Sequence, residues 1–114
     1  MLSEDEGRAV LREVFTSHGS PVSEDHLLCE EDLRVVVDGW SVDTQVGYEF
    51  VSSADRERKG LTPAVLRALE RSMAQGRLYL FLIDATDIGT REELAGAARS
   101  FLRFVAERRK AEGR

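Results

Sequence analysis

The first apolar positions of the chain recur at helical spacing. Their side chains lie three or four residues apart, as on one buried face of an amphipathic helix; they are Val10, Leu11, Val14 and Phe15. Before them, Ser3 and Glu6 have the spacing of a capping box, in which the serine oxygen accepts a free amide hydrogen and the glutamate reaches back. Because Gly19 is a common helix end, the pattern predicts a helix over about residues 4–18.

Between residues 25 and 52 the apolar period changes from helical to alternating, which is typical of half-buried strands. The alternating residues are Leu33, Val35 and Val37 in one segment and Val46, Tyr48 and Phe50 in the next. Turn residues lie between them, at Asp38-Gly39 and at 42–44. A shorter strand is expected around 26–29, with a turn at Glu31-Asp32, so this region predicts a three-stranded antiparallel meander.

A charged, aperiodic segment over 52–60 is expected to be an exposed loop. Thr62 and Pro63 then give a capping hydroxyl and a proline at the first position of a second helix. Its apolar stripe is Val65, Leu66, Leu69 and Met73, and Gly76 is the expected stop. The run Leu78–Ile83 is apolar at every position, which is typical of a strand buried on both faces at the centre of a sheet.

A last helix is expected to open at Thr90, with Glu93 completing a second capping box. The order is therefore α-β-β-β-α-β-α. At 114 residues, with 42% hydrophobic and 32% charged side chains, the chain has the size and composition of one globular domain. We expect a single α/β (α+β) domain over residues 1–114, whose mixed sheet contains the meander and one central buried strand, with helices packed on it.

The net charge and the N-terminal sequence bear on the cellular location and the partners of the protein. An acidic N-terminus argues against a signal peptide, and no apolar run approaches the ~20 residues that span a bilayer, so a cytoplasmic protein without membrane contact is expected. A net charge of −5 makes nucleic acid an unfavoured partner. Residues 1–57 hold 14 acidic and 4 basic side chains, whereas residues 58–114 hold 7 and 12. This polarity favours a protein partner or self-association.

Two carboxylates, Asp38 and Glu49, fall on the expected hairpin. This order of elements, with an aspartate ending one strand and a glutamate in the next, resembles the core of the PD-(D/E)XK restriction-endonuclease-like superfamily. The resemblance implies a divalent-metal nuclease in which the two carboxylates hold a cation such as Mg²⁺, with Glu13 completing an acidic cluster. The family's lysine, two residues after the glutamate, is replaced by Val51.

Lys59 or Arg34 could substitute for the missing lysine. The alternative to a site is structural: Asp38 starts a turn with Gly39, and Glu49 faces water between apolar neighbours.

Other residues suggest weaker sites. Asp84, Asp87 and Thr90 follow the apolar strand at the sheet edge where ligands bind in α/β folds, although they also suit a polar turn and a helix cap. Trp40 is a candidate anchor for a protein partner if it is exposed. The spacing of His18, His26 and Cys29 fits no zinc pattern, and Cys29 is expected to be a small buried residue.

Basic side chains gather on the last helix, where phosphate binding is conceivable but interleaved acids dilute the charge. The residues are Arg99, Arg103, Arg108, Arg109 and Lys110, with Glu107 and Glu112 among them. Because no catalytic set is complete, the sequence favours a non-enzymatic interaction or regulatory domain that needs no cofactor and has no catalytic or metal residues. A metal-dependent nuclease, or an inactive relative of one, is the alternative.

Overall fold

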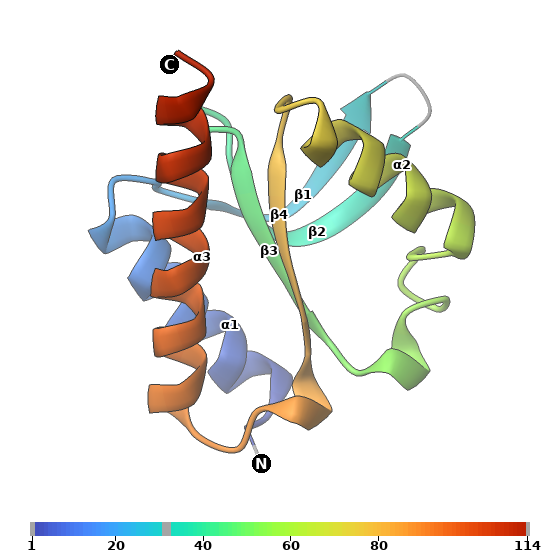
Figure 1. Ribbon diagram of the computed structural model, residues 1–114. Helices are drawn as coiled ribbons and strands as arrows, with labels where there is room; N and C mark the ends of the chain where they lie inside the picture. The colour runs from blue at the N-terminus through green and yellow to red at the C-terminus, as the bar shows by residue number, and fades with distance from the viewer. Residues whose placement is uncertain (1, 31–32, 114) are drawn as a thin grey trace.

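The computed structural model describes residues 2–30 and 33–113, and its elements follow the predicted order (Figure 1). The helices are α1 (Glu4–Ser17), α2 (Pro63–Ala74) and α3 (Arg91–Ala111), and the strands are β1 (Ser23–Glu30), β2 (Leu33–Ser41), β3 (Val46–Val51) and β4 (Tyr79–Asp84). Two short 3-10 turns, η1 (Ser53–Asp55) and η2 (Ala85–Asp87), precede α2 and α3. The predicted α+β class is confirmed.

Side-chain caps set where the helices begin. At α1 the predicted capping box forms, since Glu6 N donates to Ser3 Oγ and Ser3 N to Glu6 Oε1, both at 3.1 Å. Thr62 Oγ1 accepts from the amide of Val65 at the start of α2. Gly76, with a φ of +72°, ends that helix in the left-handed conformation.

At α3 only half of the second box forms. Thr90 Oγ1 accepts from the backbone of Glu93, but the Glu93 carboxylate takes the Thr90 hydroxyl hydrogen rather than its amide. One orphan amide at the N-terminus of the helix is therefore satisfied by the cap. The Thr90 cap marks the start of α3, which runs back along the sheet (Figure 1).

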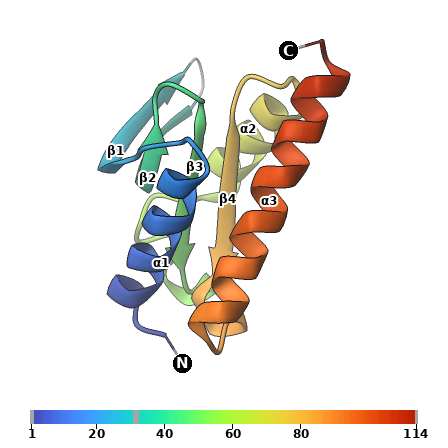
Figure 2. The ribbon, with the colours of Figure 1, turned by 90° about the vertical axis from the view of Figure 1, so that its left-hand side faces the viewer.

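The four strands form one mixed sheet between two helical layers. Its order is β1-β2-β3-β4, with β1–β2 and β2–β3 antiparallel and β3–β4 parallel. Helices α1 and α3 cover one face and α2 covers the other (Figures 1 and 2). This arrangement creates two apolar cores, one on each side of the sheet.

The expected central position of the 78–83 strand is wrong, because β4 lies at an edge of the sheet. Its side chains alternate between the two cores: Tyr79, Phe81 and Ile83 face α1 and α3, and Leu80 and Leu82 face α2. A strand needs apolar residues at every position whenever helices cover both faces, whether or not it has a neighbour on each side.

The second strand continues through the predicted turn at Asp38-Gly39 and ends at Ser41. The chain reverses afterwards, where Gln45 N donates to Ser41 O at 2.8 Å and Gln45 has a φ of +55°. The first strand is longer than expected, running from Ser23 to Glu30, and the predicted turn at Glu31-Asp32 lies outside the described residues.

The positions of the aromatic side chains confirm one expectation and contradict another. Tyr48 and Phe50 are buried on the α1 side, as predicted. Trp40 is only 2% exposed and stacks on His26 at 6.3 Å between ring centroids, so it belongs to the α2-side core and cannot serve as an exposed anchor. Cys29 shows the opposite error: it was expected to be buried and is exposed.

We predict that Gly47→Ala destabilises the protein by about 1–3 kcal/mol, a typical cost of overpacking. A Cβ at Gly47 would lie 2.4 Å from the backbone oxygen of Gly39 and 2.4 Å from the Trp40 ring. Gly96→Ala in α3 is the matched control, because its Cβ meets nothing closer than 4.0 Å, and it should stabilise by about 1 kcal/mol through helix propensity. Urea unfolding measures both; equal effects would contradict the packing argument.

Candidate functional site

The hairpin strands β2 and β3 separate at Asp38 and Glu49. Backbone pairing between them runs from Ser41–Val46 to Gly39–Tyr48 and stops there. Beyond this point β2 remains paired with β1, while β3 pairs with β4 along its whole length. The two carboxylates therefore sit where the sheet divides, a place we call the strand fork (Asp38, Glu49 and the Phe50 amide).

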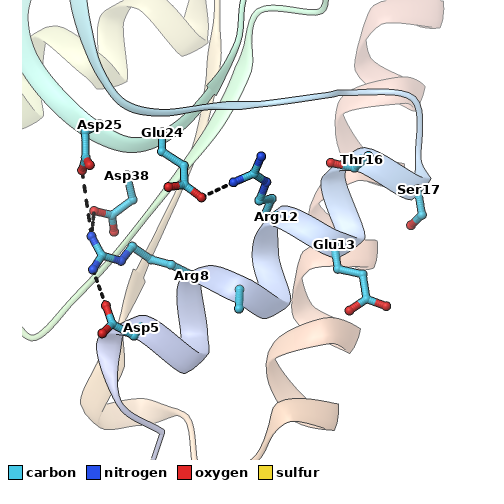
Figure 3. A pocket seen from close by; sticks show the side chains of 10 residues that line it. Asp5, Arg8, Arg12, Glu13, Thr16, Ser17, Glu24, Asp25 and Asp38 are labelled. Carbon is cyan, nitrogen blue, oxygen red and sulfur yellow. Dashed lines mark hydrogen bonds and ion pairs between the residues drawn. The ribbon is translucent and has the colours of Figure 1, made fainter.

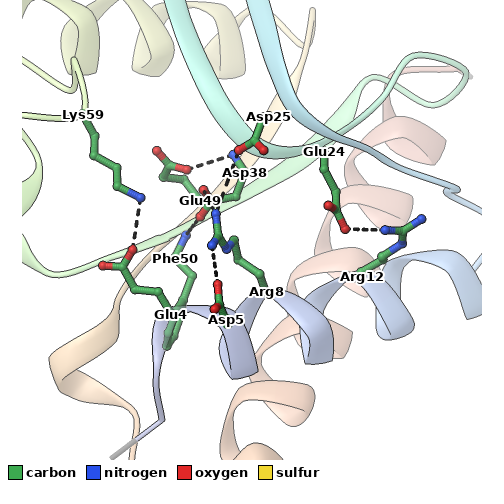
Figure 4. Close-up of polar contacts among 10 residues, drawn as sticks. All are labelled: Glu4, Asp5, Arg8, Arg12, Glu24, Asp25, Asp38, Glu49, Phe50 and Lys59. Carbon is green, nitrogen blue, oxygen red and sulfur yellow. Dashed lines mark hydrogen bonds and ion pairs between the residues drawn. The ribbon is translucent and has the colours of Figure 1, made fainter.

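Each carboxylate replaces a missing ladder bond of the opposite strand. The Asp38 amide donates to Glu49 Oε1 at 2.9 Å, and the Phe50 amide donates to Asp38 Oδ2 at 2.8 Å. These reciprocal bonds satisfy two backbone donors that would otherwise be buried without partners. Figure 4 shows that they also turn the two acidic side chains toward each other.

The expectation that Asp38 begins a turn and Glu49 faces water is wrong, since their exposed fractions are 4% and 1%. The alternation of β2 shifts at Asp38. Val37 and Trp40, three residues apart, both contribute to the α2-side core, while Gly39 approaches the Tyr48 ring on the other side. This shift lets Asp38 point within the plane of the sheet toward β3, a rotation that a regular period-two pattern does not predict.

Burial and a like charge make Glu49 an unusual acid. Burial, together with the neighbouring Asp38 carboxyl, raises the pKa of Glu49 to about 8. Its second oxygen, Oε2, is buried and has no hydrogen-bond partner among residues 2–30 and 33–113. At neutral pH Glu49 is therefore mostly protonated, and the protonated carboxyl faces Asp38 as a hydrogen-bond donor.

Two cationic side chains approach the strand fork from opposite sides (Figure 4). On one side, Lys59 Nζ lies 3.1 Å from Glu4 Oε1. Burial lowers the pKa of Lys59, but the Glu4 hydrogen bond and the charges of Asp38 and Glu49 raise it by more, so the net shift is upward. On the other side, Arg8 Nη1 lies 3.6 Å from Asp38 Oδ1.

A cavity of about 690 Å³ opens beside the fork, and Asp38 forms part of its wall (Figure 3). Arg8 spans this cavity between Asp5, Asp25 and Asp38. Glu13 also lines the cavity but points away from Asp38 (Figure 3). In the part of the chain that the structure describes, no three His, Cys, Asp or Glu side chains form a metal-binding group. Glu13 therefore does not complete the expected acidic cluster.

Lys59 and Arg34, the two residues expected to substitute for the missing lysine, lie in different places. Lys59 faces the fork, whereas Arg34 donates to Cys29 Sγ at 3.8 Å on the exposed part of the hairpin. The sequence did not single out Glu4 or Arg8, which complete the surroundings of the fork. The i,i+4 spacing of Glu4 and Arg8 at the start of α1 was the available signal, since it places both on one helix face.

Asp84, the last residue of β4, is the N-cap of η2. Asp84 Oδ1 accepts from both the amide and the hydroxyl of Thr86, and these bonds, with others from Ser53, lower the pKa of Asp84 to about 2. Thr90 caps α3. Asp87 is exposed on the turn. The structural alternative explains Asp84 and Thr90 without a ligand.

Comparison of the chain with known protein families, with curated proteins and with solved structures finds no match. No described helix has the length and apolar character needed to cross a bilayer. The strand fork therefore has to be interpreted from its own geometry.

We predict that Glu49 makes the protein less stable as pH rises. Its pKa is about 8 when folded and near the ordinary 4.5 when unfolded, so between these values the folded state binds the extra proton and the free energy of unfolding falls with pH. The slope from one group is at most about 1.4 kcal/mol per pH unit. Glu49→Gln, which resembles the protonated side chain, should remove this contribution, and urea unfolding from pH 5 to 8 measures it.

Glu13→Gln is the control, because it removes an exposed carboxyl from the neighbouring helix. It should retain the wild-type slope. Parallel stability curves for the wild type and Glu49→Gln would contradict the raised pKa.

Proposed function

We propose that the protein is a divalent-metal-dependent phosphodiesterase of the restriction-endonuclease-like class, with Asp38 and Glu49 as the cation ligands. The element order and the convergence of these two carboxylates support the proposal. The resemblance in the sequence consists of these same two residues. Carboxylates more than about 7 Å apart cannot share a cation that is held at 2.0–2.6 Å from each oxygen. Asp38 and Glu49 are close enough for the Asp38 carboxyl to raise the pKa of Glu49.

The observation that carries the proposal is the convergence of the Asp38 and Glu49 carboxylates at the strand fork. When Glu49 ionises, its Oε2 becomes a buried anionic oxygen without a hydrogen-bond partner among the described residues, which costs free energy that a bound cation would offset. A hard cation prefers oxygen ligands, and Mg²⁺ is usually held by one or two carboxylates together with waters and substrate phosphates. Asp38 and Glu49 form such a donor set, and a third protein carboxylate is not required.

The flanking side chains suit a phosphate substrate. A bound Mg²⁺ would polarise the phosphoryl group and lower the pKa of a bound water. Because the pKa of Lys59 is raised, this side chain stays protonated, and its role is to stabilise negative charge rather than to accept a proton. Arg8 holds Asp38 in place and lies at the cavity through which solvent reaches it.

Cleavage of plasmid DNA at pH 8.5, above the pKa of Glu49, tests this function. We predict Mg²⁺- or Mn²⁺-dependent cleavage that falls about a hundredfold or more in Glu49→Gln, because a catalytic metal supplies several kcal/mol of charge stabilisation. Lys59→Met should lower the rate while leaving metal affinity nearly unchanged. Glu13→Gln should cleave like the wild type, since Glu13 points away from Asp38 (Figure 3).

Calorimetric titration with Mn²⁺ provides a readout independent of the substrate. The wild type should bind one ion and Glu49→Gln should not. A wild-type protein that neither binds Mn²⁺ nor cleaves DNA would reject the proposed function.

The non-enzymatic interaction domain favoured by the sequence remains a prediction, now without Trp40 as its anchor. One observation favours it: Leu27 and Val36 are 43% and 48% exposed and lie directly opposite each other on β1 and β2. Large contiguous apolar patches mark interaction surfaces, and this cross-strand pair would lie within such a patch. Light scattering of the wild type and Val36→Ser tests self-association; a concentration-independent monomer would exclude it.

A further inference from the structure

A second cavity, of about 600 Å³, lies beyond the C-terminal end of α1. Its walls come from α3, from the turn between α1 and β1, and from the turn between β2 and β3. The volume lies within the range of small-molecule sites. Neither Asp38 nor Glu49 lines it, so it is separate from the strand fork.

Arginine supplies the charge of this cavity, and no acidic side chain lines it. Its charged residues are Arg99, Arg103 and Arg109. By contrast, the cavity beside the fork contains five carboxylates and two arginines. The acids that appeared to dilute the basic helix in the sequence lie elsewhere: Glu107 does not line the cavity, and Glu112 pairs with Arg108 at 3.6 Å. The acidic side chains of α3 are therefore absent from the lining of this cavity.

Polar groups and a fixed arginine give the cavity a defined shape. Thr44 Oγ1 donates to Ser20 Oγ at 2.8 Å, and Ser20 is only 5% exposed. The guanidinium of Arg109 lies over the Tyr79 ring at 5.2 Å and donates to Gln45 O at 3.4 Å. These contacts hold Arg109 in position before any ligand binds, which reduces the entropy lost on binding.

Arg99 and Arg103 have no ion pair with any carboxylate of the described residues. They lie four residues apart, on the same side of α3. Guanidinium groups bind phosphate oxygens through two parallel hydrogen bonds. Three of them line one cavity that has hydroxyl groups at one wall, in a protein whose overall charge is negative.

We propose that this cavity binds a phosphate group, held by Arg99, Arg103 and Arg109. The group can belong to a small phosphate compound or to a phosphodiester strand. Both present the same anionic oxygens, and the strand would add a dependence on salt. The proposal does not require the metal site, because no residue of the fork takes part in it.

The test measures binding without divalent metal, in EDTA, so that its result is independent of cleavage. The probes are inorganic phosphate, adenosine monophosphate and a fluorescein-labelled single-stranded thymidine oligonucleotide. Amide chemical-shift changes report the first two, and fluorescence anisotropy reports the third. We expect saturable binding with shifts at Ser20, Thr44 and Arg103. Tighter binding of the oligonucleotide that weakens with salt would identify a strand, whereas equal binding of phosphate alone would identify a small anion.

Arg103→Gln should weaken the affinity about tenfold, as expected for loss of a charged hydrogen bond, and Arg103→Lys should weaken it less. Arg67→Gln is the control, because Arg67 is exposed on α2, on the opposite face of the sheet, and the substitution changes the net charge equally. It should bind like the wild type. No saturable binding up to about 10 mM of any probe, or an equal loss in Arg67→Gln, would overturn the proposal.

Discussion

The division of the sheet at Asp38 and Glu49 is the constraint around which the rest of the fold is arranged. Where β2 leaves β3, two backbone amides lose their ladder partners inside the protein, and the carboxylates supply them. This solution brings two acids together in a buried place, which raises the pKa of Glu49. Lys59 and Arg8 then offset the charge from two directions. The local structure of the fork and its proposed chemistry therefore depend on the same two hydrogen bonds.

Most of the fold could be predicted because each element carries a local signal. The caps at Ser3, Thr62 and Thr90 and the alternation of Tyr48 and Phe50 act through neighbouring residues, and the structure has each of them. The edge position of β4 could not be predicted in this way. Side-chain patterns report which faces are covered, whereas strand order depends on hydrogen bonds between segments distant in the sequence.

The site was predictable only in part for a related reason. Asp38 and Glu49 were recognisable by type and order, but their burial follows from a shift in the alternation of β2 that no local pattern encodes. Lys59 lies at the fork beside its partner Glu4, which is 55 residues away in the sequence. Other long-range ion pairs join the acidic first half of the chain to the basic second half. Examples are Arg91 with Glu6 and Arg77 with Glu30.

The pairing of α1 with α3 on one face of the sheet has a consequence for synthesis on the ribosome. Phe15 of α1 contacts both Tyr48 and Phe101, so the ring cluster joins the first helix to the last. A nascent chain that has released β3 already exposes Tyr48 and Phe50 but lacks the helix that seals their surroundings. Growing chains must carry this uncovered apolar surface until α3 has been synthesised, and incomplete domains are prone to aggregate or to need a chaperone during such a period.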